Sequence, residues 1–429
     1  MKILIKNCNL ISMDENRDKI EYGMDILICD NIFTKIDKNI QIENDYKIID
    51  ATNKYVLPGF INTHAHIAMS IFRESVDGYQ TQDWLQQKIW PIEDKLTPED
   101  VYNSTLLSCI EMIKTGTTTV NDQYFFPENI IEAVLKSGIR CELTRVVMDI
   151  DGNFTQRFEE LNSLINNYNN KYDNIYISIG IHGLYTSSQD CINKAIGLAR
   201  DNNLNIHMHY LENSQEITDI SNNYNGLKPY EIIKNNFNGI HSIFAHCVKL
   251  ENEDYEIFKE YGISIAHCPI SNLKLGCGIA NVPKMIENDI IVSLGTDGQG
   301  SGSNLDMFET MKFTGLLQKG TNEAPTLLPA YEILKMATIN GAKALNKEKI
   351  LGSISENKKA DLIILNLSNV VNQPINDVFA DIVYNAKGTN VETTIVNGNV
   401  LMENRNLIGL NENEIIENCK NILKNKLES

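Results

Sequence analysis

The chain has 429 residues, of which 42% are hydrophobic and 22% charged, and its formal net charge is −18. This composition is typical of a globular protein with a large core, and the excess negative charge argues against nucleic acid as a partner. We find neither a signal-peptide pattern nor an apolar run near the roughly 18 residues that span a bilayer. Nine scattered cysteines without C-x-x-C spacing indicate reduced thiols. We therefore expect a cytoplasmic protein that binds neither nucleic acid nor membrane.

Both ends of the chain have the alternating pattern of short β-strands. Strand-like segments near the N-terminus flank an expected turn at Asp30-Asn31, and two near the C-terminus flank the hairpin signal Asn397-Gly398-Asn399. We expect residues 1–57 and 350–429 to form one small β-sandwich domain from both termini. A terminal helix over residues 412–427 should pack on the outside of the barrel formed by the middle of the chain.

Residues 58–349 alternate strand-like and helix-like segments. Thr97, Pro98 and Asp100 have the pattern of an N-cap, a first helical residue and a capping-box partner, and that helix should end before Gly116. Eight βα units over more than ~250 residues predict an α/β fold, a (β/α)₈ barrel of the TIM type. Its expected strands are the run before His64 and residues 117–120, 141–147, 176–182, 204–209, 242–247, 263–267 and 290–297.

Metal-binding residue types follow several of these strands, at the carboxyl ends where the catalytic groups of such barrels lie. His64 and His66 end the first strand and, being two positions apart, share a face; His209 ends the fifth strand and Asp297 the eighth. This donor set predicts one divalent metal ion per chain, with Zn²⁺ favoured and Fe²⁺, Mn²⁺ or Ni²⁺ as alternatives. Such an ion lowers the pKa of a coordinated water to ~7 and makes it a nucleophile.

Three side chains at these strand ends are candidates for catalysis. Glu212 would donate a proton to the substrate, Asp297 would accept one from the water, and His246 would hold the nucleophile or a developing oxyanion. Taken singly, each has an ordinary structural explanation, such as a helix cap for Asp297 or a core imidazole for His246. Their common position at strand ends favours catalysis. We interpret His207 and His267 as interior or pocket-lining residues.

Several longer segments of the chain carry a resemblance to a known family. They are PGFINTHAHIAMSIFR, WLQQKIWPIEDKLTPEDVY, EMIKTGTTTVND, HMHYLE, AHCVKL, SIAHCPISNLKLGCGIANVP and LGTDGQGSGSNLDMFE. Over nearly the full length, the chain resembles the amidohydrolase superfamily, and within it the 5′-methylthioadenosine/S-adenosylhomocysteine deaminases. The resemblance implies a single metal ion with His64, His66, His209 and Asp297 as ligands.

The resemblance also implies substrate contacts. Glu93 would accept hydrogen bonds from ribose hydroxyls, and Arg145 would hold a carboxylate or a ribose oxygen. His182, Glu212 and Asp297 would contact the substrate near the metal.

The implied reaction is hydrolytic deamination of an adenine nucleoside (S-adenosylhomocysteine, 5′-methylthioadenosine, 5′-deoxyadenosine or adenosine) to the inosine analogue and ammonia. Glu212 would protonate N1 of the ring, and Asp297 would carry a proton to the departing ammonia. One alternative is a related amidohydrolase acting on guanine, 8-oxoguanine, cytosine or a triazine. Another is a barrel kept as a scaffold without catalysis. A homo-oligomer is left open.

Three loops differ from the usual family sequence, and all three should line the pocket. They are the Gly183-Leu184-Tyr185 run, the Tyr210–Asn213 run, and the loop that contains Gly298, Gly300 and Gly302. None removes a metal ligand, so they bear on the choice of substrate and not on the type of reaction.

Overall fold

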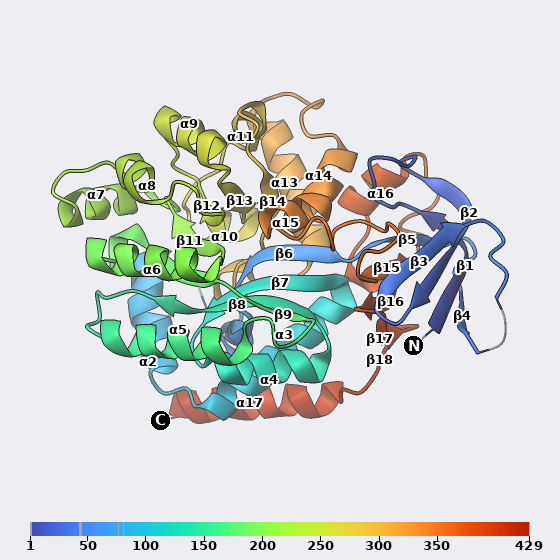
Figure 1. Ribbon diagram of the computed structural model, residues 1–429, viewed down its shortest axis with the longest axis horizontal. Helices are drawn as coiled ribbons and strands as arrows, with labels where there is room; N and C mark the ends of the chain where they lie inside the picture. The colour runs from blue at the N-terminus through green and yellow to red at the C-terminus, as the bar shows by residue number, and fades with distance from the viewer. Residues whose placement is uncertain (1, 43–44, 76, 80, 429) are drawn as a thin grey trace.

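The computed structural model describes residues 2–42, 45–75, 77–79 and 81–428 (Figure 1). Within these ranges, eight parallel strands follow one another around a barrel in sequence order, and a short strand, β9 (Ile175–Ile177), pairs with β8. The eight are β6 (Phe60–Ala65), β7 (Thr117–Tyr124), β8 (Arg140–Val147), β10 (Ile179–Gly183), β11 (Ile206–Tyr210), β12 (Ser242–His246), β13 (Ser264–His267) and β14 (Val292–Leu294). The first and last meet, because the amide N of Asp297 donates to the carbonyl of His64 over 3.0 Å. The predicted barrel is confirmed.

Helices lie around this barrel, and local signals determine where some of them begin and end. Helix α3 (Pro98–Thr115) begins with the predicted capping box, in which Thr97 and Asp100 each accept a hydrogen bond from the other's backbone N–H, and it ends at Gly116 with φ 90°. The remaining helices of this part are η1 (Ile67–Phe72), α1 (Thr81–Trp84), η2 (Leu85–Ile89), α2 (Trp90–Glu93), α4 (Pro127–Ser137), α5 (Phe154–Tyr168), η3 (Leu184–Thr186), α6 (Gln189–Asn202), α7 (Ser214–Asn223), α8 (Pro229–Asn236), α9 (Asn252–Tyr261), α10 (Pro269–Lys274), α11 (Val282–Glu287), α12 (Gln299–Gly302), α13 (Met307–Thr321), α14 (Ala330–Met336) and α15 (Ile339–Ala344).

Strands from both termini, blue and red in Figure 1, form a second sheet. In the described part of the chain it contains β1 (Lys2–Leu10), β2 (Glu21–Cys29), β3 (Ile32–Asp37), β4 (Lys47–Asp50), β5 (Tyr55–Pro58), β15 (Leu362–Leu365), β16 (Val391–Val396), β17 (Asn399–Glu403) and β18 (Asn406–Leu407). The two termini join where β5 pairs antiparallel with β15. A bridge from Ile32 to Lys359 brings the far edge back to the segment just before β15, and the sheet packs around one apolar cluster that includes Ile28 and Ile364. This confirms the predicted sandwich built from both termini. The divisions at 57/58 and 349/350 stay predictions.

Three helices follow β15: α16 (Val378–Tyr384), η4 (Gly388–Asn390) and α17 (Glu412–Glu428). Helix α17 packs outside, against α3 (Figure 1), where Lys114 Nζ lies 2.7 Å from the Glu412 carboxylate. No helix among the described residues has the length and apolar character needed to cross a bilayer.

Candidate active site

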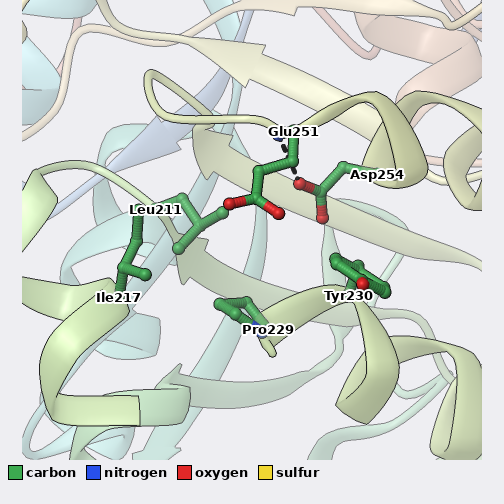
Figure 2. Close-up of a pocket in the computed structure, with 6 residues that line it drawn as sticks. All are labelled: Leu211, Ile217, Pro229, Tyr230, Glu251 and Asp254. Atoms are coloured by element: carbon green, nitrogen blue, oxygen red, sulfur yellow. Dashed lines mark hydrogen bonds between the residues drawn. The ribbon is translucent and has the colours of Figure 1, made fainter. Parts of the chain in front are cut away.

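The hollows of the structure differ greatly in size. A crevice between α7, α8 and α9 (Figure 2) leaves essentially no free volume, so it has no room for a ligand. Its walls are Leu211, Ile217, Pro229, Tyr230, Glu251 and Asp254. A second cavity, of about 1060 Å³, opens at the carboxyl ends of the barrel strands. Predicted site residues line this larger cavity.

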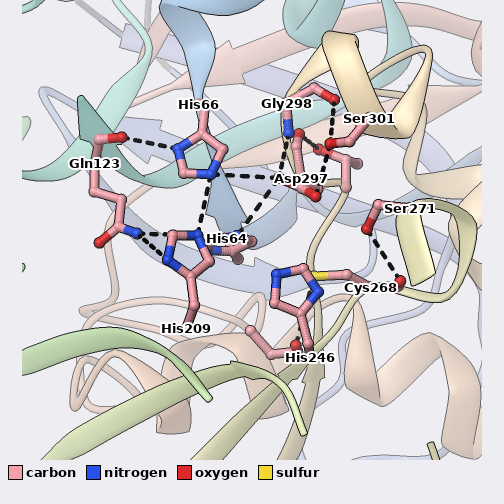
Figure 3. A network of polar contacts seen from close by, with 12 residues as sticks. His64, His66, Gln123, His209, His246, Cys268, Ser271, Asp297, Gly298 and Ser301 are labelled. Atoms are coloured by element: carbon pink, nitrogen blue, oxygen red, sulfur yellow. Dashed lines mark hydrogen bonds and ion pairs between the residues drawn. The ribbon is translucent and has the colours of Figure 1, made fainter. Parts of the chain in front are cut away.

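The four predicted metal ligands lie together (Figure 3), and three of them, His66, His209 and Asp297, line that cavity. His66 Nε2 lies 3.3 Å from His209 Nε2 and 3.3 Å from Asp297 Oδ1, and His64 Nε2 lies 3.6 Å from Asp297 Oδ1. Ligand atoms arranged tetrahedrally around an ion ~2.0–2.1 Å away lie about 3.3–3.4 Å apart. The spacing therefore fits one small divalent ion.

Backbone hydrogen bonds orient two of the imidazoles so that their Nε2 atoms point at the metal position, although Gln123 Nε2 also lies 3.2 Å from His209 Nε2. His66 Nδ1 donates to the carbonyl of Gln123 over 2.8 Å, and His209 Nδ1 donates to the carbonyl of His182 over 2.6 Å. Because carbonyl oxygens only accept, both Nε2 atoms carry lone pairs directed at the common centre. His64 Nε2 is buried and has no hydrogen-bond partner within the described ranges. Such an orphaned nitrogen is expected of a metal ligand.

Charge at the centre also suits a divalent cation. Burial lowers the pKa of His64 to about 3 and that of His209 well below its ordinary value, so these imidazoles are neutral. Burial alone would raise the pKa of Asp297, but its contacts with His64 and His66 outweigh burial and hold that pKa well below the usual range. Neutral imidazoles and one carboxylate are the protonation states that bind metal.

The backbone is strained where the strands reach this centre. Leu211, His246 and Asp297 have φ of 49°, 72° and 62°, in the left-handed region. Non-glycine residues held there cost on the order of 1–3 kcal/mol each and cluster at functional sites. Two hydrogen bonds hold Asp297, one from the backbone N of Gly298 and one from Ser301 Oγ, each 2.7 Å long.

The predicted catalytic residues Glu212 and His246 lie beside the ligands. His246 Nδ1 lies 3.8 Å from the Glu212 carboxylate and donates to Asn272 Oδ1 over 2.8 Å. Burial raises the pKa of Glu212. Burial lowers the pKa of His246, but the charges of Glu212 and Asp297 outweigh it, and the net shift is upward. A buried acid and a buried imidazole thus face the same centre.

The predicted substrate contacts Glu93, Arg145 and His182 all line the cavity. Glu93 Oε1 accepts a hydrogen bond from Tyr124 Oη over 2.5 Å, and burial raises the pKa of Glu93 to about 7. His182 Nδ1 lies 2.9 Å from Thr186 Oγ1. These side chains therefore offer polar groups to a ligand that extends away from the metal centre.

Two arginines line the far part of the cavity, on the ring of Phe125. Arg145 Nε lies 2.5 Å from the Glu160 carboxylate, so the predicted contact residue also forms a strand-end ion pair. Arg157 pairs with Asp151, yet its Nε and Nη1 atoms are buried without a partner among the described residues. Two donors of this guanidinium are therefore unused among the described residues.

Sequence reasoning did not find Arg157, Gln123, Asn272 or Ser301. Gln123 had a usable signal, since it lies two residues after Asn121 on a strand whose side chains alternate. The other three are brought in by helices and loops that fold over the strand ends, so no local pattern marks them. His207 and His267 are buried, and His207 contacts His64.

Comparison with known proteins places the chain in a family. The amidohydrolase family model matches residues 55–401. A 5-methylthioadenosine/S-adenosylhomocysteine deaminase of Acetivibrio thermocellus is 39% identical over 435 residues, covering 100% of both chains. A 5′-deoxyadenosine deaminase of Methanosphaera stadtmanae is 39% identical over 422 residues, covering 97% of each. The crystal structure of an adenosine deaminase from Xanthomonas campestris with bound zinc superposes with a TM-score of 0.93 at 26% identity, over 100% of this chain and 99% of that one. These matches confirm the predicted resemblance, and the chain belongs to the amidohydrolase family.

Proposed function

We propose that this chain catalyses the hydrolytic deamination of an adenine nucleoside to the inosine analogue and ammonia. The observation that carries the proposal is one cavity lined by His66, His209 and Asp297 of the proposed metal site, by a buried acid, Glu212, and by a second carboxyl group, Glu93. The names of the full-length relatives support a nucleoside with a modified 5′ position. The candidates are S-adenosylhomocysteine, 5′-methylthioadenosine, 5′-deoxyadenosine and adenosine.

In this proposal His64, His66, His209 and Asp297 hold one divalent ion. Their nitrogen and oxygen donors favour Zn²⁺, and the solved relative contains zinc. When bound, the ion supplies an activated water at neutral pH. None of the cysteines in the described structure forms a disulfide, which favours a reducing compartment, the cytoplasm.

The chain's own residues move the protons. Glu212, whose pKa is raised by burial, donates to N1 of the adenine ring and makes C6 more electrophilic. His246, fixed by Asn272 through Nδ1, directs Nε2 at the oxygen that adds to C6. Asp297 takes a proton from that oxygen and delivers it to the C6 amino group. The C6–N bond breaks and ammonia leaves, and the oxygen of water stays on C6 as the carbonyl once its remaining proton passes to Glu212, which restores the acid.

The far part of the cavity would bind the sugar and its 5′ substituent. Glu93 would accept hydrogen bonds from the ribose hydroxyls, with His182 contacting the substrate nearer the metal. Arg145 and Arg157 would face the 5′ group. A bare base or a triazine would leave these side chains without a ligand, so the observed lining favours a nucleoside.

A substrate panel tests the proposal. Protein purified without chelator is analysed for metal, and ammonia release is followed with the four adenine nucleosides and with guanine, cytosine and a triazine. We expect about one metal per chain and ammonia from at least one adenine nucleoside. Ammonia from guanine or a triazine alone would overturn the substrate class. A chain that holds no metal, even after zinc is added, would favour a scaffold.

A further inference from the structure

We infer that His207 is a positioning residue for His64, an inference that rests on the proposed metal site. His207 lies on β11, two residues before His209 and on the same inward face, and is fully buried. Its Nε2 lies 2.8 Å from His64 Nδ1, and the two rings meet edge to face, with centroids 5.0 Å apart and planes at 84°. The proposed ligand is thus held by a second histidine.

The tautomers of the two rings follow from this contact. His64 offers Nε2 to a metal only when its proton is on Nδ1. That N–H then donates to His207 Nε2, which must carry a lone pair, so the hydrogen of His207 is on its Nδ1 atom. The bond therefore fixes the tautomer of His64 and the direction in which its Nε2 points.

His64 differs in this respect from the other two imidazoles. His66 and His209 donate to backbone carbonyls of Gln123 and His182, which no side-chain substitution removes. The orientation of His64 depends on a side chain. Loss of such an outer partner typically weakens metal binding roughly 10–100-fold.

His267 provides a matched comparison. It ends β13, another barrel strand, and is 1% exposed. Neither of its ring nitrogens has a hydrogen-bond partner within the described ranges. The same substitution at His207 and at His267 therefore removes an equally buried imidazole, but only the first removes a contact with a proposed ligand.

The test measures metal binding and not turnover. Zinc affinity is determined by competition with a chromogenic chelator, and the absorption spectrum of the Co²⁺-loaded protein reports ligand geometry. We expect His207→Leu to weaken zinc binding roughly 10–100-fold and to change the Co²⁺ spectrum. His207→Gln, whose amide oxygen can accept from His64, should recover much of the affinity. His267→Leu should bind zinc as the parent does.

Variants of His64 distinguish an error in the metal site from an error in the role of His207. If His64→Gln also keeps its zinc, the metal site and the proposed function are wrong. If His64→Gln loses zinc while His207→Leu binds it as tightly as the parent, only the role of His207 is wrong. Thermal unfolding of the metal-free variants shows whether they fold. If the leucine variant does not fold, His207→Asn, too short to reach His64, is compared with His207→Gln, and equal affinities would overturn the inference.

Discussion

Carboxyl groups of one cavity differ in protonation because their neighbours differ. Burial raises the pKa of Glu93 to about 7 and also raises that of Glu212, so both favour the protonated form. Asp297 is as buried as Glu212, but it contacts two histidines and stays ionised. Groups whose surroundings separate their pKa values in this way can serve as acid and base at one pH.

Replacing Glu212 by glutamine should remove the proposed acid while keeping its size. We expect Glu212→Gln to lower kcat about 10²–10⁴-fold and to leave the metal content unchanged. Glu256→Gln, an exposed change on α9, is the control and should behave as the parent. Metal analysis and ammonia release measure the two properties. Loss of metal would mean that Glu212 is itself a ligand.

Glu93 should make stability depend on pH. Its folded pKa of about 7 lies above the ordinary value of 4.5, so its contribution to stability is complete below about pH 4.5 and is lost as the pH rises through 7. The full effect is on the order of 3 kcal/mol. Glu93→Gln has no carboxyl group to ionise, so it does not lose this stability. The difference in melting temperature, variant minus parent, should therefore grow as the pH is raised from about 5 to 8. For the control Glu253→Gln, exposed on α9, this difference in melting temperature should be the same at every pH. A difference that is also independent of pH for Glu93→Gln would contradict the raised pKa of Glu93.

Arg157 should discriminate between 5′ substituents. Its two unpartnered nitrogens can bind the carboxylate of S-adenosylhomocysteine but have no such group to bind in 5′-deoxyadenosine. A hydrogen bond to a charged group is worth ~1.5–3 kcal/mol. Arg157→Met should therefore lower kcat/KM roughly 10–100-fold for the first substrate and much less for the second. Arg200→Met on α6 is the control. Equal losses for both substrates would exclude this role.

At the scale of elements, the segment after β14 needs glycines where it passes beside the proposed metal site. A Cβ on Gly300 would lie 2.9 Å from the ring of Trp84 and 3.2 Å from Met69. A Cβ on Gly302 would lie 2.2 Å from the carbonyl oxygen of Thr296. The glycine-rich loop thus lets η1 and α1 pack closely onto the loop that follows Asp297.

The change in the free energy of unfolding caused by replacing a glycine with alanine should depend on which atoms the new Cβ contacts. Gly300→Ala should destabilise by about 1–3 kcal/mol because side chains must shift. Gly302→Ala should cost more, since a backbone carbonyl cannot move aside so easily. Gly197→Ala in α6, where the Cβ meets open space, should stabilise by about 0.5–1 kcal/mol. Urea unfolding gives the order, and a smaller loss for Gly302→Ala than for Gly300→Ala would contradict it.

Elements with local signals could be predicted from the sequence, and contacts between elements could not. Thr97 and Asp100 lie three residues apart, so their capping box is visible in the chain. Strand β7 was predicted to end at residue 120 but continues to Tyr124, because its polar residues face a polar barrel interior and not solvent. Strand β14 ends earlier than expected, at Leu294, before the left-handed turn at Asp297. The bond between Glu93 and Tyr124 joins residues of two elements, which no spacing reveals.

At the scale of the whole molecule, a buried ion pair joins the barrel to the terminal sheet. The Arg140 guanidinium on β8 donates two hydrogen bonds to the Asp361 carboxylate, 2.9 and 3.0 Å long. The Arg140 side chain is fully buried, and the Asp361 side chain nearly so. Asp361 also accepts a hydrogen bond from the backbone N of Asn397, in the turn between β16 and β17. One contact therefore involves the barrel and two C-terminal segments.

Breaking this pair should be costly. Asp361→Asn leaves the Arg140 charge buried without its partner, for which we expect a loss of about 3–5 kcal/mol in the free energy of unfolding. Glu417→Gln, in the exposed pair with Lys420, should cost only about 0–1 kcal/mol. The double variant Arg140→Met/Asp361→Leu should regain much of the loss. Urea unfolding measures all three, and equal costs for the two single variants would exclude a structural role for the pair.

The pairing of β5 with β15 has a consequence for synthesis of the chain on the ribosome. Pro58 pairs with Leu362, so the edge of β5 has to wait for roughly 300 residues to be made before its partner exists. At ~5–20 residues per second, that delay is about 15–60 s. During this time the nascent N-terminal strands present an unpaired edge of the kind that promotes aggregation. The N-terminal edge is therefore most exposed to aggregation while the barrel is still being synthesised.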